Sequence, residues 1–240
     1  IKGLVEEYDD FFQNKLENNF EIIIIPNGCK DKTVEYVERL KKQNKRVQYS
    51  VLDQGNKGKA VIQGFNLAEG EYIGFVDADG STSPEAFYDL LIKMEPNDGA
   101  IASRWLKDSK ITIKQPLKRR IAGRSFNFFV RTMLGLRFTD TQCGAKIFKK
   151  KAIKQVYRKL GITKWAFDID LLYLMKRNNF KIKEVATEWK EPGNSHLNLV
   201  KATIEMFLAL MRLRLIYSPF RFVVAAYDAL PEKIKIHHKL

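Results

Sequence analysis

The sequence predicts an α/β protein in which a mainly parallel sheet is flanked by helices. Segments of strand length alternate with segments of helix length through the first hundred or so residues, which is the order of βαβ units. The strand segments are nearly continuous apolar runs, as expected for strands that are buried on both faces. The chain of 240 residues is 45% apolar and 29% charged, a globular composition that is sufficient for one sizeable core.

The first two strand–helix units follow from the sequence pattern. EIIIIPNGCKDKT, residues 21–33, is a β-branched run that ends in a turn signal. The helix after it carries Val34, Val37 and Leu40 at helical spacing. RVQYSVL is the second strand, and GNKGKAVIQGFNLAEG is a helix bounded by glycines. The pattern therefore predicts two consecutive βα units.

The third predicted strand, YIGFVDADG, ends in a pair of aspartates, Asp77 and Asp79. Ser83 and Pro84 begin the next helix, because serine caps a helix and proline suits its first turn. GAIAS, around Ala100, is the fourth strand. Since ligands of open α/β sheets bind outside the carboxyl ends of the strands, the two aspartates are candidate site residues.

Two like charges at one strand end are stabilised by a hard divalent cation, which prefers oxygen ligands and retains substrate phosphates. Asp77 and Asp79 therefore predict a Mg²⁺ or Mn²⁺ site for a substrate with a diphosphate leaving group. The alternative is an aspartate that caps a turn beside an unrelated surface aspartate, because a single Asp-x-Asp is frequent by chance.

The second half of the chain is strongly basic. The net charge of +14 indicates an anionic partner: nucleic acid, a membrane surface or a phosphorylated substrate. Residues 110–159 contain fifteen Lys or Arg and a single acid, Asp140. RSFNFFVRTMLGLRF and ATIEMFLALMRLRLIY are apolar segments with arginines, and neither has the uncharged run of about 20 residues that spans a membrane. Each suits a helix in the lipid headgroup layer or a buried helix with surface arginines, and together they favour a membrane surface.

Five motifs, in their order and spacing, resemble those of family 2 glycosyltransferases with the GT-A fold, a Rossmann-like fold of transferases that use nucleotide-diphosphate sugars. The motifs are IIIIPNGCKDKT, GNKGKAVIQGF, FVDADGST, SRW and TDTQCGAKIF, and the resemblance spans about residues 21–189. More narrowly, the chain resembles the polyprenyl-phosphate (dolichyl-phosphate) sugar synthases. DADGST and DTQCG favour the dolichyl-phosphate β-glucosyltransferase branch over the mannosyl branch.

Two departures from the family pattern concern the nucleotide pocket. IKGLVEEYDDFF resembles the helix that follows the family's first strand, so we expect that this sequence does not include that strand, which helps to hold the nucleotide base. Pro26 and Asn27 stand where the family has two aspartates, and Cys29 replaces a serine. An inactive membrane scaffold of the same fold is therefore one alternative to an enzyme.

The resemblance implies an inverting transfer of one hexose from a nucleotide-diphosphate sugar, with UDP-glucose favoured, to a polyprenyl or dolichyl phosphate. In this reaction Asp79 would ligate Mg²⁺ or Mn²⁺, and Asp77 would contact the ribose or a metal-bound water, so both are implied at the metal. The implied catalytic residues are Asp77, Asp79, Asp140 and Gln142. The implied donor-nucleotide residues are Asn27, Asp31, Lys59, Asp77 and Asp79. The implied acceptor-phosphate residues are Arg104, Arg120, Arg124 and Ser125.

Side-chain chemistry agrees with these roles. Guanidinium groups match phosphate oxygens bidentately, and an acceptor phosphate that is already anionic needs no strong general base. Catalysis would rest on in-line positioning and on neutralising the departing diphosphate, with Asp140 orienting a substrate. The alternatives are a structural salt bridge for Asp140 and a solvated lysine for Lys59. The segment at Asp168 resembles a family segment that flanks the acceptor, and is otherwise a plain helix start.

The predicted organisation is a GT-A catalytic domain over residues 1–196, with a basic interface helix at about 115–136, and an amphipathic membrane-associating segment over 197–240. Cys29 and Cys143 have no metal spacing and fit a reducing compartment, so we expect the protein on the cytoplasmic face of a membrane, without a nucleic-acid partner. The alternatives are a mannose synthase-like enzyme that uses GDP-mannose and a soluble GT-A transferase that acts on a glycan hydroxyl. A third, from another class, is a basic nucleic-acid-binding module, although no motif of such modules occurs.

Overall fold

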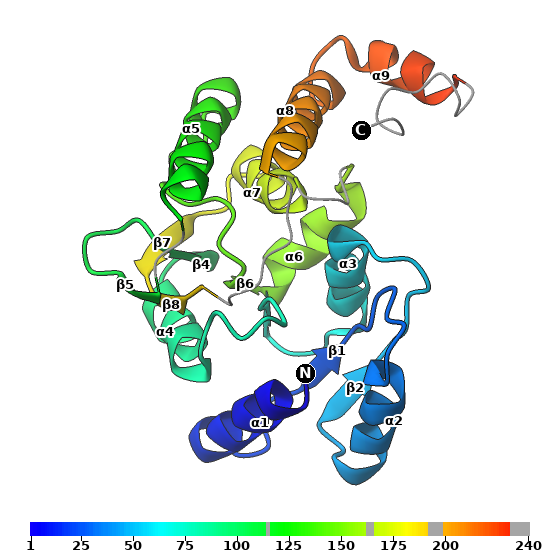
Figure 1. The fold of residues 1–240 in the computed structure, drawn as a ribbon, viewed down its shortest axis with the longest axis vertical. Coiled ribbons are helices and arrows are strands. Elements are labelled where there is room, and N and C mark those ends of the chain that lie inside the picture. Colours follow the sequence, from blue (N-terminus) through cyan, green and yellow to red (C-terminus); the bar gives the residue numbers. More distant parts are fainter. Residues whose placement is uncertain (114–115, 162–165, 192–198, 231–240) are drawn as a thin grey trace.

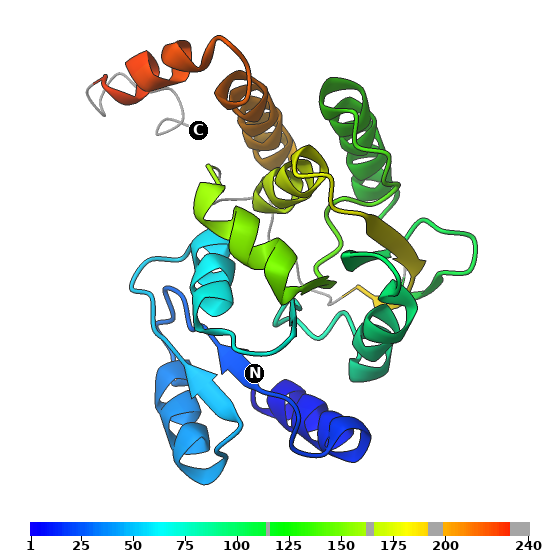
Figure 2. The same ribbon diagram turned by 180° about the vertical axis from the view of Figure 1, so that it is seen from behind.

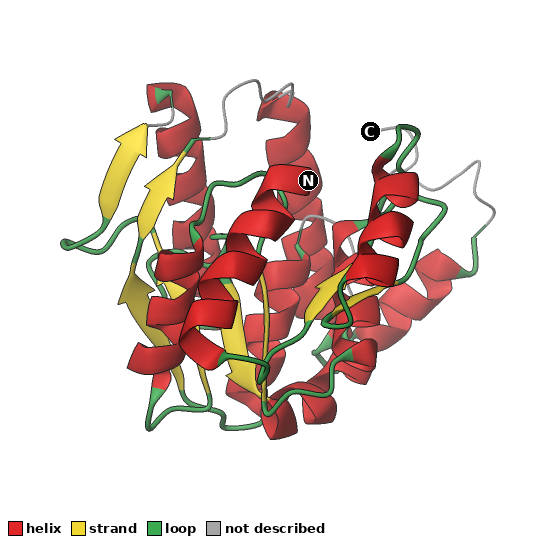
Figure 3. Cartoon of the chain, turned by 90° about the horizontal axis from the view of Figure 1, so that it is seen from below, coloured by secondary structure: helices red, strands yellow, loops and turns green. Residues whose placement is uncertain are grey.

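The computed structural model of the chain describes residues 1–113, 116–161, 166–191 and 199–230, and it consists of strands flanked by helices (Figure 1, Figure 3). In chain order the elements are α1 (Lys2–Leu16), β1 (Ile22–Ile24), α2 (Thr33–Gln43), β2 (Val47–Tyr49), α3 (Lys57–Leu67), β3 (Tyr72–Phe75), α4 (Pro84–Met94), β4 (Gly99–Ser103), β5 (Lys110–Ile113), α5 (Leu117–Leu134), β6 (Lys146–Lys149), α6 (Lys150–Val156), a 3₁₀ turn (Tyr157–Lys159), α7 (Phe167–Arg177), β7 (Ile182–Ala186), β8 (Glu188–Lys190), α8 (Leu199–Ile216) and α9 (Arg221–Asp228).

The central sheet has four strands in the order β3-β6-β4-β7. β4 and β7 are parallel, whereas β6 lies antiparallel between β3 and β4, with Lys146 opposite Phe75. β1 and β2 form a separate parallel pair, and so do β5 and β8. The predicted α/β class is confirmed, and the four strands that the sequence predicts correspond to β1, β2, β3 and β4. The central sheet is mixed rather than mainly parallel, because β6 is antiparallel to both of its neighbours. The sequence did not reveal the antiparallel strand β6, which brings its own amino end to the carboxyl ends of β3 and β4.

Local sequence explains where the helices begin. Ser83 accepts a hydrogen bond from the backbone N of Ala86 at 3.3 Å, and Pro84 occupies the first turn of α4. Asn56 caps α3 in the same way through the backbone N of Lys59, at 3.0 Å. Asp31 lies just before α2, and its Oδ1 accepts from the backbone N of Thr33.

Different helices cover the two faces of the central sheet. Side chains alternate along a strand, so Ile101 of β4 packs into a cluster with residues of α5, α6 and α7. Ala100 and Ala102 face the other way and pack with Leu90 and Met94 of α4. The sheet is therefore buried on both faces, and its strand ends remain as the place for a site.

Helices α5 and α8 lie side by side, as the views from both sides of the molecule show (Figure 1, Figure 2). α5 corresponds to the predicted interface helix. α8 contributes two buried leucines, Leu210 and Leu213, to the core. In the described parts of the chain, each helix is too short or too polar to cross a membrane. The predicted division into a catalytic domain (1–196) and a membrane-associating segment (197–240) stays a prediction. The boundary between them and residues 231–240 lie outside the described residues.

Candidate active site

The candidate site lies where the carboxyl ends of β3 and β4 meet the amino end of β6; we call this region the carboxylate edge. Because β6 is antiparallel, the segment before it reaches the same edge as the residues after β3 and β4. The backbone N of Asp77 donates to the carbonyl of Gly144 at 3.1 Å, and that of Ala102 donates to Ala145 at 3.0 Å. Two segments that are far apart in the sequence, those of Asp77 and of the motif TDTQCG, therefore meet here.

The Asp77 carboxylate packs directly on Gly144. A Cβ atom added to Gly144 would lie 2.0 Å from Oδ2 of Asp77, so this close approach requires glycine. On its other side, Oδ1 of Asp77 lies 2.8 Å from Nζ of Lys57. Burial raises the pKa of Asp77, the ion pair with Lys57 opposes this, and the charge of Asp168 adds to the increase.

Two aspartates and two lysines form a chain of alternating charges at this edge. Nζ of Lys57 also lies 3.3 Å from Oδ2 of Asp168, whose Oδ1 lies 2.6 Å from Nζ of Lys146. Lys146 is fully buried and donates to the carbonyl of Cys143 at 2.6 Å. Burial lowers the pKa of Lys57, but the charges of Asp168 and Asp77 outweigh this effect and raise it. Four charged side chains are therefore neutralised within the protein.

Asp79 lies on the loop after β3 and is exposed. Its Oδ1 accepts a hydrogen bond from the backbone N of Ser81 at 2.9 Å. Within the described ranges no group of three or more His, Cys, Asp or Glu side chains is arranged to hold a metal ion. Asp79 and Asp77 would thus offer only carboxylate oxygens, and few of them. That donor set fits Mg²⁺ or Mn²⁺, which take one or two carboxylates together with substrate phosphates and water.

The predicted donor-nucleotide residues lie on loops that close on one another. Oδ1 of Asn27 accepts from the backbone N of Asn56 at 2.7 Å, and Asn27 bridges to Leu52 after β2. Asp31 and Lys59 are both exposed. Lys57 is the lysine that reaches the aspartates, and the sequence analysis did not single it out. The contact of Lys59 with the donor stays a prediction. A sequence signal existed, because both lysines flank the glycine of GNKGK, but the spacing does not tell which one points inward.

Arg104, at the end of β4, forms a bidentate ion pair with Asp140. The distances are 2.7 Å from Nε to Oδ2 and 2.9 Å from Nη2 to Oδ1, and the Arg104 backbone N also donates to Oδ2. Burial would raise the pKa of Asp140, but Arg104 outweighs it and holds this pKa below its usual range. The sequence analysis named a structural salt bridge as an alternative role for Asp140, and Asp140 does form a salt bridge with Arg104. Gln142 is close by, since its backbone N donates to Oδ1 of Asp140 at 3.3 Å.

Glu184 of β7 holds the backbone of Thr139 and Asp140 in place. The sequence analysis did not identify Glu184. Its carboxylate accepts from the backbone N and the hydroxyl of Thr139, and from the backbone N of Asp140 at 2.7 Å. A carboxylate on a strand interior has no motif signature, so only the fold reveals this contact.

The predicted acceptor residues divide into two groups. Arg120 and Arg124, one turn apart on α5, lie over the ring of Trp105, with their guanidinium carbons 6.0 and 4.8 Å from its centroid. Arg104 precedes Trp105 in the chain and lies over Trp189 at 5.3 Å. The structure thus gathers the three predicted arginines around two tryptophans.

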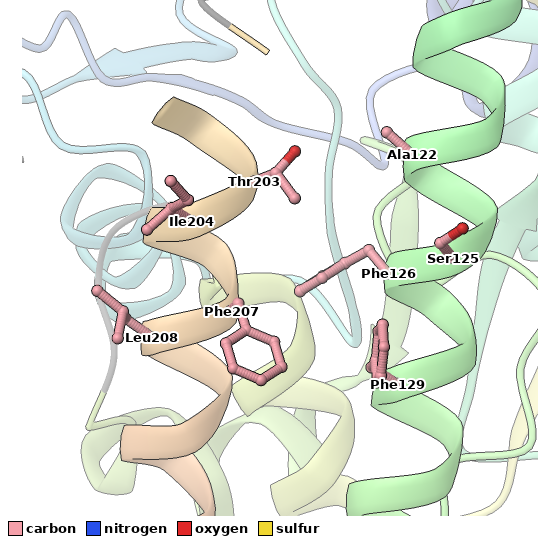
Figure 4. A pocket seen from close by; sticks show the side chains of 8 residues that line it. All are labelled: Ala122, Ser125, Phe126, Phe129, Thr203, Ile204, Phe207 and Leu208. Carbon is pink, nitrogen blue, oxygen red and sulfur yellow. The ribbon is translucent and has the colours of Figure 1, made fainter. Parts of the chain in front are cut away.

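Ser125 does not join them. Because successive helical residues are turned by about 100°, it faces a groove of about 310 Å³ between α5 and α8 (Figure 4). The groove is almost entirely apolar, and its lining residues are Ala122, Ser125, Phe126, Phe129, Thr203, Ile204, Phe207 and Leu208. The side-chain amide of Gln142 lies near Met206 of α8, 4.0 Å from its sulfur.

The helices α5, α8 and α9 expose large apolar side chains. On α5, Ile121 is 57% and Phe128 62% exposed, on either side of the exposed Arg124. We call the set the apolar face: Leu117, Ile121, Phe128, Phe129, Ile204, Phe207, Leu208, Met211, Phe220, Phe222 and Val223. Large apolar side chains that are exposed on neighbouring helices suit a protein or membrane contact.

Comparison with known proteins places the chain among the glycosyltransferases. The profile "Glycosyl transferase family 2" matches residues 8–157. The dolichyl-phosphate beta-glucosyltransferase of Dictyostelium discoideum is 35% identical over 212 residues, which cover 84% of this chain and 64% of that protein. The enzyme of the same name from Saccharomyces cerevisiae is 30% identical, over 86% of this chain and 68% of that protein. The chain spans somewhat less than two thirds of the length of the Dictyostelium relative.

Two solved structures of glucosyl-3-phosphoglycerate synthase from Mycobacterium tuberculosis share the fold. The complex with UDP has a TM-score of 0.56 at 16% identity and covers 82% of this chain and 70% of the other. The complex with Mn²⁺, UDP-glucose and phosphoglyceric acid has a TM-score of 0.56 at 15% identity, over 82% and 69%. These GT-A enzymes confirm the predicted fold. From the profile match and the relatives of 30% identity or more, the chain belongs to glycosyl transferase family 2.

Proposed function

We propose that this chain is the catalytic part of an inverting transferase that moves glucose from UDP-glucose to dolichyl phosphate, or a related polyprenyl phosphate, at the cytoplasmic surface of a membrane. The names of the curated relatives support the acceptor and the sugar. The UDP-glucose and Mn²⁺ in the solved neighbour support a nucleotide-sugar donor and a divalent ion.

One observation carries the acceptor class: α5 offers cations and exposed apolar side chains together. Arg120 and Arg124 lie over Trp105, and Ile121 and Phe128 are exposed on the same helix. A phosphate that is attached to a long hydrocarbon chain satisfies both features, because the arginines bind its oxygens and the apolar side chains enter the membrane that holds its chain. A soluble glycan acceptor uses neither feature.

The carboxylate edge provides the donor side. Asp79 and Asp77 would hold Mg²⁺ or Mn²⁺, which when bound neutralises the charge that develops on the departing diphosphate. Asn27, in the loop against α3, stays the proposed contact to the nucleoside, with Asp31 and Lys59 at the exposed rim.

The reaction is a single displacement. An oxygen of the acceptor phosphate forms a bond to the anomeric carbon, the bond from that carbon to the diphosphate oxygen breaks, and the configuration inverts. The nucleophile is already anionic, so no side chain has to remove a proton. Both oxygens of Asp140 are engaged by Arg104, which supports a role for Asp140 in holding Arg104 toward the substrates. Gln142 would act beside it by positioning.

The proposal is tested by incubating the full-length protein with dolichyl phosphate, Mg²⁺ or Mn²⁺, and a panel of UDP- and GDP-sugars, followed by mass spectrometry of the lipid. We expect glucosyl phosphoryl dolichol from UDP-glucose and no product after chelation of the metal. If the only product is a mannosyl lipid from GDP-mannose, the transferred sugar is mannose and not glucose. Transfer to a glycan hydroxyl, without use of the lipid, would overturn the acceptor assignment.

A further inference from the structure

The carboxylate that should face the metal and the nucleotide already has a cationic partner. Oδ1 of Asp77 lies 2.8 Å from Nζ of Lys57. An ion that binds through this oxygen must therefore compete with an ammonium group of the protein. This competition raises the question of where Lys57 goes when the ion is bound.

The two lysines at the carboxylate edge differ in how firmly they are held. Lys146 is fully buried, 2.6 Å from Asp168, and also donates to the carbonyl of Cys143. Lys57 is 30% exposed and is shared between Asp77, which is 34% exposed, and Asp168 at 3.3 Å. If Lys57 leaves, Asp168 keeps Lys146 as its partner. Only Asp77 loses its counter-charge, and a divalent ion would replace it.

Charge balance indicates where the Lys57 ammonium would then turn. A partly buried carboxylate needs a cation, and Lys57 supplies it when the donor is absent. A divalent ion near Asp77 makes the Lys57 charge surplus at close range, where two cations repel one another. The donor brings a diphosphate to the same place, and a lysine on its flexible stem can bind phosphate as a point charge.

We propose that Lys57 is a positioning residue that exchanges partners: it neutralises Asp77 in the donor-free enzyme and contacts the donor diphosphate once a divalent ion takes its place on Asp77. This inference rests on the proposed function, because it assumes a nucleotide-diphosphate donor with its metal ion.

Lys59 provides the matched control. It lies two residues away on the first turn of α3 and carries the same charge, but its side chain is exposed. Lys57 forms ion pairs with Asp77 and Asp168. Lys59 forms no ion pair with any residue that the structure describes. Removing Lys59 therefore changes the charge of the region without removing the competitor.

The exchange predicts two effects of opposite sign in the variant Lys57→Met. Mn²⁺ alone should bind about threefold more tightly, because the competing ammonium is gone. UDP in the presence of saturating Mn²⁺ should bind about tenfold more weakly, because a charge-assisted contact to phosphate is lost. A lysine with a purely structural role would not separate the two affinities in this way.

The experiment uses the full-length protein, stripped of metal with a chelator and checked for folding by circular dichroism. Free Mn²⁺ is measured by electron paramagnetic resonance during a titration, and UDP binding at saturating Mn²⁺ is measured by calorimetry. Lys57→Arg, which keeps the charge, should bind Mn²⁺ nearly as the wild type does. Lys59→Met should leave the Mn²⁺ affinity within about twofold of the wild type, because Lys59 does not compete for Asp77.

The proposal is overturned if either effect is missing in Lys57→Met, or if Lys59→Met shows the same pair of effects. Neither titration contains the lipid, so a failure to glycosylate dolichyl phosphate affects the proposed function and not this inference. A wild-type protein that binds neither Mn²⁺ nor UDP would overturn both proposals, whereas binding that Lys57→Met leaves unchanged overturns only this one.

Discussion

The carboxylate edge and helix α5 carry charge in opposite ways. At the edge, Asp77 and Asp168 are neutralised by lysines, and Asp140 by Arg104, all of them partly or fully buried. On α5, Arg120 and Arg124 lie over an aromatic ring, and in the part of the chain that the structure describes neither forms an ion pair. The edge is therefore balanced before a ligand arrives and suits a donor that brings its own cation. The helix is left cationic and suits a ligand that brings an anion.

The largest effect is expected from Asp79, an exposed carboxylate that forms no ion pair with any residue that the structure describes. Asp79→Ala should reduce metal-dependent turnover by about 100-fold or more, because several kcal/mol of charge stabilisation are lost. Turnover is measured at saturating Mn²⁺. Asp53→Ala, an exposed aspartate in the loop after β2, should retain full activity. Full activity of Asp79→Ala would show that Asp79 is not a metal ligand, and that the carboxylate edge does not serve the donor as the comparison with α5 requires.

The internal balance of the edge also predicts a stability effect. Asp140→Asn leaves the largely buried Arg104 guanidinium without its counter-charge, which should lower the free energy of unfolding by about 3–5 kcal/mol at pH 7. Chemical denaturation measures this difference. Arg124→Ala, which removes an exposed charge from α5, should change the stability by less than about 1 kcal/mol. Equal losses in both variants would show that the two regions do not differ.

The sign of the pH dependence follows from the lowered pKa of Asp140. The unfolded-state pKa is about 3.9, so the stabilisation is complete above it and is lost as the pH falls through the lower folded-state pKa. The gap between wild type and Asp140→Asn should stay constant from about pH 5 to 8 and narrow below about pH 4. A gap that widens on acidification would contradict the ion pair.

A smaller effect is expected from the close contact that fixes Asp77. Gly144→Ala forces the Asp77 carboxylate to move, since the new Cβ would lie 2.0 Å from Oδ2. We expect kcat to fall about tenfold or more, because displacement of a positioned group by about 1 Å has large kinetic consequences. Gly3→Ala, where a Cβ has open space, is the control and should leave kcat unchanged. An active Gly144→Ala enzyme would show that the position of Asp77 is not critical.

The smallest effect concerns the apolar face. Phe128→Ser and Ile121→Ser should each weaken partition to vesicles of mixed neutral and anionic lipid by about fivefold to tenfold, as expected when an apolar side chain no longer enters the membrane. Sedimentation with vesicles measures the partition. Ile92→Ser is a matched control, because Ile92 is 58% exposed but belongs to α4, which lies apart from α5, α8 and α9 (Figure 1, Figure 2). Equal effects at Ile92 would remove the assignment of a membrane-facing side.

Local patterns were sufficient to predict much of the fold. The β-branched run before Pro26, the cap at Ser83 and the apolar run before Asp77 each produce the expected element. The strand β6 was missed because it is short and begins with Lys146, a residue that usually indicates a solvent-exposed position. Its charge is paired with Asp168, which is 22 residues away in sequence, and its ammonium group also donates to the carbonyl of Cys143.

The site was predicted in part for a similar reason. A carboxylate at a strand end is visible in the sequence, which therefore predicts Asp77 and Asp79 at this edge, and the structure places Asp77 there beside Gly144. A pair such as Lys57 and Asp77 has no sequence signature, because the two residues come from different elements and meet only through folding. The sequence analysis grouped Ser125 with Arg124, but the two side chains point in different directions, because successive residues of a helix are turned by about 100°.

The most direct test of the account measures the KM for each of the two substrates in the double variant Arg120→Ala/Arg124→Ala. Arg131→Ala, which removes an exposed arginine from the same helix, is the control. We expect the KM for dolichyl phosphate to rise about tenfold or more, since charge-assisted contacts to phosphate are lost, while the KM for UDP-glucose stays within about twofold. An equal rise in both constants, or a rise for the nucleotide sugar alone, would contradict the division of labour between α5 and the carboxylate edge.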